Sequence, residues 1–167
     1  LDYGLFTKKT VETMKVPVES RFLSPLLMGF LSTDDQQKKL ALAKGVIPLP
    51  PKDKIIGQFV LAFDSDHAVS SVARKAMKEI PEVFFALLMN DADLPPALLH
   101  NLVLLYHKNE TAIEMLLQNS SLKFRSLQKI AGQLSRTAIL QALQNQIKIL
   151  EFPEIVADFY KNPLLKP

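Results

Sequence analysis

The chain has 167 residues, of which 48% are apolar and 22% are charged, a composition typical of globular proteins and not of disordered ones. It contains no Cys, which excludes a disulfide scaffold, a cysteine-ligated zinc or iron–sulfur site and a cysteine nucleophile. The net charge is +3, and the cations are scattered along the sequence, whereas nucleic-acid-binding domains usually concentrate their positive charge.

The longest apolar stretch near the start, residues 22–31, is interrupted by Ser24, Pro25 and Gly29. It is shorter than the about 20 residues that a membrane span needs. It also lacks the basic segment and the small-residue cleavage site of a signal peptide. We therefore expect no transmembrane segment and a cytoplasmic location.

Residues 1–20 have no regular pattern and are expected to form an irregular segment. The apolar residues that follow have helical spacing and predict a helix: Phe22, Leu23, Leu26, Leu27, Phe30 and Leu31. This helix is expected to cap the open end of a helical stack, and a homodimer interface is the alternative. We divide the chain accordingly into 1–34, an irregular segment with a capping helix, and 35–167, one continuous helical-repeat domain.

Three helices are predicted next. The first follows the N-cap cluster Thr33-Asp34-Asp35 and is closed by Gly45. The second begins at Leu49-Pro50-Pro51, because proline is tolerated in a first turn. The third is capped by Asp64-Ser65-Asp66 and runs to residue 79, with an apolar stripe on one face. The core-facing residues expected of the second helix are Ile55, Ile56, Phe59, Val60 and Phe63.

The second half continues in the same way, with helices over 83–89, from Pro95 to Tyr106 and from Asn109 onward. A helix over 122–131 is expected after the cap Asn119-Ser120-Ser121, with Gly132 at its end. A long helix is expected from Ser135 to residue 150, followed by a last helix around 155–159 and a further turn at Asn162-Pro163. The inward residues predicted for the long helix are Ile139, Ala142, Leu143, Ile147 and Leu150.

No segment alternates with the period of a strand, so the prediction is an all-α protein of about ten short helices. Pro81, Asn109 and Ser135 open successive first helices at spacings of 28 and 26 residues, and Pro95 and Leu122 open second helices 27 apart. Self-similarity at this period is typical of a solenoid of stacked helix pairs. An irregular helical bundle is the alternative.

Four phrases carry a resemblance to known repeats: 44–51 (KGVIPLPP), 64–69 (DSDHAV), 119–122 (NSSL) and 145–150 (NQIKIL). With them, the segment 37–163 resembles α-helical repeats of the HEAT and leucine-rich-repeat-variant type, as found in uncharacterised bacterial multidomain proteins. The resemblance implies a right-handed stack of antiparallel helix pairs whose second helices line a concave surface. The variant family can carry a cysteine-ligated iron–sulfur cluster, a feature that this chain, without Cys, does not share.

Catalytic and metal-binding signatures are absent from the sequence. The three His residues, His67, His100 and His107, do not have the spacing of a helical zinc site. The acidic pairs lie where helices need N-caps, and none belongs to an EF-hand loop. No P-loop, nucleophile elbow or dinucleotide-binding fingerprint occurs. We therefore expect no enzyme, no metal and no cofactor.

The outward faces of two second helices supply the candidate partner-binding residues: His67, Ser71, Arg74 and Lys78 on the helix over 66–79, and Arg125 and Lys129 on the helix over 122–131. An ordinary solvated helix face is the alternative. Asn145 and Gln146 lie within the predicted long helix, where Asn is a poor helix former. We expect a structural role for these two amides, and a polar contact to a partner is the alternative.

The expected function is a non-enzymatic protein-interaction or scaffolding module of a bacterial protein, whose partner is another protein or a neighbouring domain of the same chain. Nucleic-acid binding by a basic concave face, as in HEAT-like alkylpurine DNA glycosylases, is an alternative. The absence of Trp, the three Tyr and the low net charge disfavour it. A regulatory domain for a small ligand, with a site assembled across helices, is the other alternative.

Overall fold

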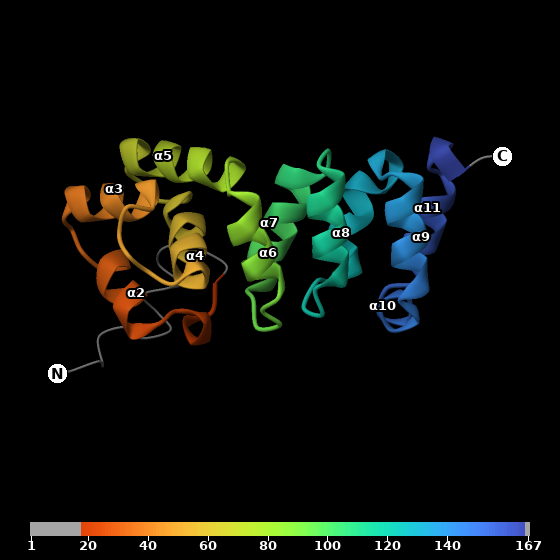
Figure 1. The fold of residues 1–167 in the computed structure, drawn as a ribbon, viewed down its shortest axis with the longest axis horizontal. Helices are drawn as coiled ribbons and strands as arrows, with labels where there is room; N and C mark the ends of the chain where they lie inside the picture. The colour runs from red at the N-terminus through yellow and green to blue at the C-terminus, as the bar shows by residue number, and fades with distance from the viewer. Residues whose placement is uncertain (1–17, 166–167) are drawn as a thin grey trace. The chain divides into compact units, whose positions relative to one another are not determined.

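The computed structural model describes residues 18–165, and every regular element among them is a helix, which confirms the predicted all-α class. The irregular segment expected at the start of the chain lies mostly outside the described residues. The chain divides into two units, Leu1–Leu88 and Met89–Pro167, which are described separately (Figure 1).

In the first unit, each helix packs mainly on the helix that follows it in the sequence or on the one after that. α3 packs on α5, α4 packs on both of them, and α2 packs on α4 and α3. The elements are η2 (Ser20–Phe22), α2 (Pro25–Leu31), α3 (Gln36–Lys44), α4 (Pro51–Leu61), α5 (His67–Lys78) and α6 (Glu82–Met89), the last residue of which already belongs to the second unit.

The second unit repeats this kind of packing. α8 packs on α7 and α9, and the 3₁₀ helix η3 packs on α7 and α11. The elements are α7 (Pro96–Tyr106), α8 (Glu110–Gln118), η3 (Phe124–Gln133), α9 (Arg136–Gln144), α10 (Gln146–Glu151), α11 (Glu154–Tyr160) and η4 (Pro163–Leu165).

Helices begin where the sequence places capping side chains. The side-chain oxygens of Asp35, Asp66, Asn109 and Ser135 accept hydrogen bonds from backbone N–H groups in the first turns of α3, α5, α8 and α9, as predicted. Gly45, at φ +72°, ends α3, and its N–H donates to Ala41 and Leu42 carbonyls. This left-handed conformation carries no penalty for glycine.

Two sequence expectations about 119–132 are wrong. The segment after Asn119 forms the 3₁₀ helix η3 in place of the expected α-helix, and its N-cap, Lys123, makes no side-chain cap. The Asn119 side chain is used elsewhere, as described below. Gly132 lies inside η3, and Gly45 is the described glycine with positive φ, so Gly132 does not end a helix.

The long helix expected from Ser135 to residue 150 is in fact two helices. Asn145, at φ −88° and ψ 81°, ends α9, and its side chain accepts a hydrogen bond from the Lys148 N–H to begin α10. Leu143 of α9 and Ile147 and Leu150 of α10, all expected in the core, are 36%, 73% and 80% exposed, and Lys148 of α10 is buried.

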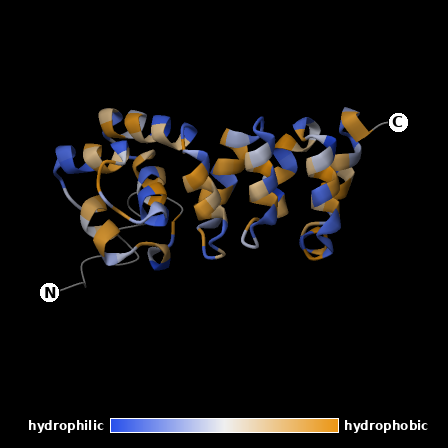
Figure 2. Ribbon diagram, viewed as in Figure 1, coloured by the Kyte–Doolittle hydropathy of each residue, from blue (hydrophilic) through white to orange (hydrophobic). Residues whose placement is uncertain are grey.

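The remaining core expectations hold in large part. Ile55, Ile56, Phe59 and Val60 of α4 are buried. Phe63 lies beyond the end of α4 and is 45% exposed, with its ring edge-on to Phe59 at 5.4 Å. Figure 2 shows hydrophobic and hydrophilic residues on most of the helices, as expected for elements with one buried face.

The apolar segment 22–31 does not form one helix. Phe22 lies in η2, and Leu27 and Leu31 of α2 are buried, whereas Leu26 is 57% exposed. Much of this apolar face is therefore covered inside the first unit. The homodimer through 22–31 stays a prediction that rests on Leu26 and its half-buried neighbours.

Three buried polar side chains link loops of the second unit, and each donates to two backbone carbonyls about one helix pair earlier in the sequence. The separations are 26–31 residues. The links run from Asn119 Nδ2 to the carbonyls of Met89 (2.8 Å) and Asp91 (2.9 Å), from Lys148 Nζ to those of Ser120 and Leu122, and from Asn162 Nδ2 to those of Ala131 (2.7 Å) and Leu134 (2.9 Å).

Candidate functional site

The outward face of α5 carries the residues expected there. His67, Ser71, Arg74 and Lys78 are all exposed, and their helical spacing places them along one side of α5, opposite the buried Val69, Ala73 and Met77. One of these four side chains already has a hydrogen-bond partner within the first unit, since Arg74 Nε donates to the Ala62 carbonyl at 2.8 Å. A cation at the C-terminal end of α4 is favourable there, so Arg74 has a structural role within the first unit.

Arg125 and Lys129 are both exposed on η3 in the second unit. Their spacing of four residues aligns side chains on an α-helix, but a 3₁₀ helix has three residues per turn, which puts positions i and i+4 about 120° apart. The predicted pairing of these cations on one face is therefore wrong. The Arg125 guanidinium instead lies 5.2 Å from the centre of the Phe152 ring, a cation–π contact.

The two amides expected inside the long helix lie at its break. Asn145 is half-buried and caps α10 by accepting from the Lys148 N–H at 3.2 Å. Gln146 is exposed at the start of α10. The structural role predicted for Asn145 is thus local capping, and neither amide is buried against a neighbouring helix.

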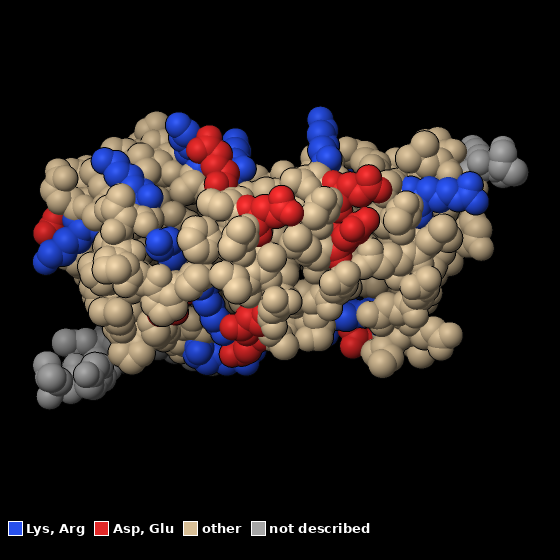
Figure 3. Space-filling model, viewed as in Figure 1, with Lys and Arg blue, Asp and Glu red and all other residues tan. Residues whose placement is uncertain are grey.

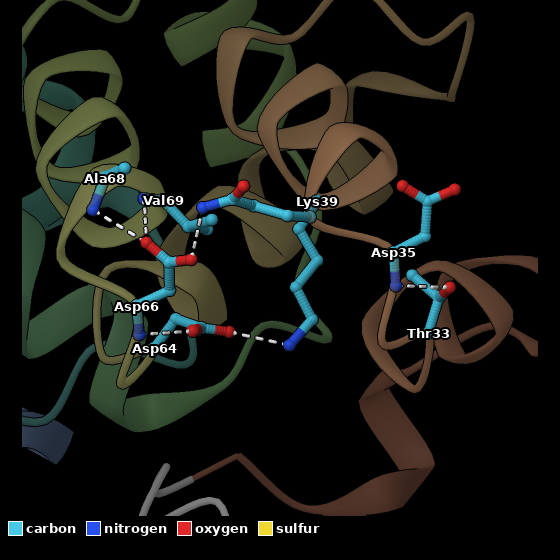
Figure 4. A network of polar contacts seen from close by, with 8 residues as sticks. Thr33, Asp35, Lys39, Asp64, Asp66, Ala68 and Val69 are labelled. Atoms are coloured by element: carbon cyan, nitrogen blue, oxygen red, sulfur yellow. Dashed lines mark hydrogen bonds and ion pairs between the residues drawn. The ribbon is translucent and has the colours of Figure 1, made fainter.

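The acidic pair Asp64 and Asp66 forms a hydrogen-bond network with α3 (Figure 4). Asp66 accepts from Gln36 Nε2 at 2.6 Å and from the N–H groups of Ala68 and Val69. Asp64 accepts from Lys39 Nζ at 3.0 Å and from the Asp66 N–H at 2.8 Å. Asp66 thus caps α5, as predicted, and the bonds from Gln36 and Lys39 link the α4–α5 turn to α3.

The same network sets the acidity of Asp66. The hydrogen bond from Gln36 is the main cause that holds the pKa of this carboxyl below its ordinary value of 3.8, and the backbone N–H groups and Lys39 act in the same direction. Partial burial opposes them. The carboxylate therefore stays ionised and continues to accept these bonds at neutral pH.

The first unit contains a pocket of about 310 Å³ that no sequence pattern indicated. Its walls come from the end of α3, from α4, from the end of α5 and from the start of α6. The residues that give it chemical character are Lys44, Lys54, Gln58, Glu79, Ile80 and Phe84. None of them belongs to the outward set predicted from the sequence, because they come from four elements and share no local pattern.

Two features shape this pocket. The Lys54 ammonium lies 5.8 Å from the centre of the Phe84 ring, so α4 and α6 meet at one wall. Gly45 forms part of another wall, where a Cβ atom would lie 3.0 Å from Gln58 Nε2 and 3.4 Å from Lys54 Cδ. The absence of a side chain at Gly45 thus keeps this part of the pocket open.

Lys148 in the second unit is a buried charged side chain that no sequence pattern indicated. Burial lowers the pKa of this ammonium, nearby Glu151 raises it and Lys123 lowers it further. Its two carbonyl partners, of Ser120 and Leu122, still require a donor, which the charged ammonium supplies. The residue acts as a structural link, and no local signal distinguishes it from an exposed lysine.

The described residues show few other features that indicate a metal site or a membrane-spanning segment. Within residues 18–165, no three His, Asp or Glu side chains converge as ligands for a metal ion. His107 Nδ1 lies 2.8 Å from the Leu104 carbonyl at the end of α7. No described helix combines the length and the apolar character needed to cross a membrane.

On the face drawn in Figure 3, basic and acidic side chains are interspersed, and most of the surface belongs to neither kind. Neither unit shows a continuous basic area on that face.

Comparisons with family models, with curated proteins and with solved structures found no match to this chain. The resemblance to HEAT-like repeats is therefore a proposal that rests on this chain's own residues.

Proposed function

We propose that the chain is a non-enzymatic protein-interaction module, built in each unit from helix pairs that stack like HEAT or leucine-rich-repeat-variant repeats. The observation that supports it best is the recurrence of the loop links at 26–31 residues. Successive repeats of similar length place equivalent loops side by side, so similar separations are expected of such a stack. The packing of α3 on α5, of α8 on α9 and of η3 on α7 and α11 agrees with it.

The proposed partner surface in the first unit is the outward face of α5. The side chains of His67, Ser71 and Lys78 are exposed there. Among residues 18–165, none of the three side chains forms a hydrogen bond or ion pair with another element. In the second unit the candidates are Arg125 and Lys129, which point in different directions from η3. A protein partner fits this mixed, weakly charged surface better than a nucleic acid does, because phosphate recognition needs clustered cations.

The test is capture of partners by the immobilised protein from lysate of its own source, at low and high salt and with or without nuclease. We expect the same one or two proteins to be retained at high salt. Lys78→Glu and Arg125→Glu should each abolish their retention. Lys108→Glu, at an exposed lysine beyond the end of α7, is the matched control and should retain them.

Two results would overturn the proposal. Loss of all captured material on nuclease treatment or at high salt would indicate nucleic-acid binding, whose affinity falls steeply with salt. Equal retention by Lys78→Glu, Arg125→Glu and the control would show that these faces are ordinary solvated surface.

A further inference from the structure

The pocket in the first unit has the size of a site for one small group. Ligand pockets usually enclose about 300–1,000 Å³, and this one measures about 310 Å³. A group the size of one amino-acid residue fits that volume. The first constraint on an occupant is therefore its size.

The charges on the pocket walls give the second constraint. Lys44 and Lys54 both line the pocket, and neither ammonium is paired with a carboxylate among residues 18–165. Glu79 lies on the wall formed by the end of α5. Two cations and one anion leave one positive charge, which matches a monoanion and disfavours a doubly charged phosphate beside Glu79.

Apolar atoms give the third constraint. The Phe84 ring is 40% exposed, and Ile80 and Pro81 lie beside it in the lining. An exposed aromatic ring next to aliphatic side chains favours a flat or branched apolar group. Because the Lys54 ammonium already lies 5.8 Å from the Phe84 ring centre, an anion bound by Lys54 would bring its apolar body close to that ring.

The side-chain amide of Gln58 gives the fourth constraint on an occupant of the pocket. Gln58 is 7% exposed, and its Nε2 donates to the Ala43 carbonyl at 3.1 Å. That bond fixes the amide, and no described donor bonds to its Oε1, which leaves this oxygen of a pocket-lining residue available as an acceptor. An N–H group on the occupant would satisfy this oxygen.

We propose that this pocket is a binding site for an apolar, residue-sized group that carries one carboxylate. The carboxylate is bound by Lys44 and Lys54, and the apolar group packs on Phe84 and Ile80. A free aromatic or branched carboxylic acid and the C-terminal residue of a peptide share this chemistry. The site is independent of the proposed partner surface on α5, because the two share no residue.

The experiment is an amide chemical-shift titration with N-acetylphenylalanine and with its neutral amide, N-acetylphenylalaninamide. We expect saturable shifts at Gly45, Gln58 and Phe84 with the acid. The amide should bind about tenfold more weakly, because it lacks the charge-assisted hydrogen bonds. A short peptide that ends in phenylalanine with a free carboxylate, titrated in parallel, identifies the source by its affinity relative to that of the free acid.

Variants separate the pocket from the rest of the basic surface. Lys54→Met keeps most of the apolar stem and should weaken acid binding about tenfold. Lys75→Met, at an exposed lysine of α5 outside the pocket, should leave the affinity unchanged. The unfolding midpoint of each variant is measured first, so that loss of binding is not loss of fold.

The proposal is overturned if neither the acid nor the peptide gives saturable shifts at the pocket residues. It is also overturned if acid and amide bind equally, or if Lys75→Met weakens binding as much as Lys54→Met. None of these results bears on the capture of partners by α5, so the two proposals fail separately.

Discussion

The side chains of Asn119 and Asn162 make the same set of hydrogen bonds in different places of the second unit. In each, the amide nitrogen donates to two earlier carbonyls and the amide oxygen accepts from the backbone N–H two residues later. Asparagine can do both because its side chain offers two donors and an acceptor on a short stem. Both residues are buried, at 3% and 0% exposure, and the two bonds that Asn162 donates to carbonyls are buried as well.

Asn162→Ala should therefore lower the free energy of unfolding by about 2–3 kcal/mol, because two buried carbonyls and one N–H lose their partner. Urea denaturation of the purified protein measures the change. Gln146→Ala, at an exposed amide, is the control and should change stability by less than about 0.5 kcal/mol. Equal effects of the two substitutions would show that the Asn162 bonds add nothing to stability.

Asp66 makes stability depend on pH in a definite direction. Its pKa in the folded protein lies below the ordinary value of 3.8, chiefly because of the Gln36 hydrogen bond. Its contribution is therefore complete above the unfolded pKa and is lost as the pH falls through the folded pKa. The stability difference between the unmodified protein and Asp66→Asn should stay constant above about pH 5 and shrink below about pH 4. A difference that does not vary with pH would contradict the role of the carboxylate charge.

At the scale of elements, the sequence predicts what is decided locally. Asp35, Asp66, Asn109 and Ser135 cap helices as expected, since a cap bonds N–H groups only two or three residues away. The break at Asn145 was missed because Leu143, Ile147 and Leu150 keep helical spacing on both sides of it. Spacing alone does not show whether the backbone between such residues stays helical.

The 3₁₀ winding of η3 was missed for a similar reason. Its buried residues Phe124, Leu127 and Ile130 recur at intervals of three, a period that suits a 3₁₀ helix and is close to that of an α-helix. The misplacement of Arg125 and Lys129 on one face follows directly from that ambiguity. η3 also packs against α7 and α11, and these tertiary contacts are not visible in the sequence.

Close packing of α2 and α3 on α4 depends on Gly57. A Cβ atom there would lie 2.8 Å from Leu27 Cδ1 and 3.2 Å from the Leu42 methyl groups. Gly57→Ala should destabilise the protein by about 1 kcal/mol, because overpacking outweighs the gain in helix propensity. Gly29→Ala is the matched control on α2, where nothing lies within 4 Å of the added atom, and should stabilise by about 0.5–1 kcal/mol. Thermal unfolding of both variants gives the signs, and a stabilising Gly57→Ala would refute the contact argument.

At the scale of the whole molecule, the sequence predicted the all-helical class and helix starts spaced by 26–28 residues. The loop links at separations of 26–31 residues could not be predicted from the sequence. Lys148 donates to two backbone carbonyls in one link, whereas asparagines do so in the others, so the links share no residue type. The pocket was invisible too, since Lys44, Lys54, Glu79 and Phe84 meet only when four elements of the first unit come together. Helix caps and other contacts between near neighbours can be predicted from one sequence, whereas a pocket or a hydrogen bond between distant segments cannot.

The 3₁₀ conformation of η3 also changes the length of this helix along its axis. A 3₁₀ helix rises about 2.0 Å per residue and an α-helix about 1.5 Å. The ten residues of η3 therefore extend about 20 Å, a length that an α-helix reaches only with about 13 residues. This rise is comparable to the about 17 Å of the 11-residue α7, on which η3 packs, so a 3₁₀ segment with fewer residues can match the length of a neighbouring α-helix.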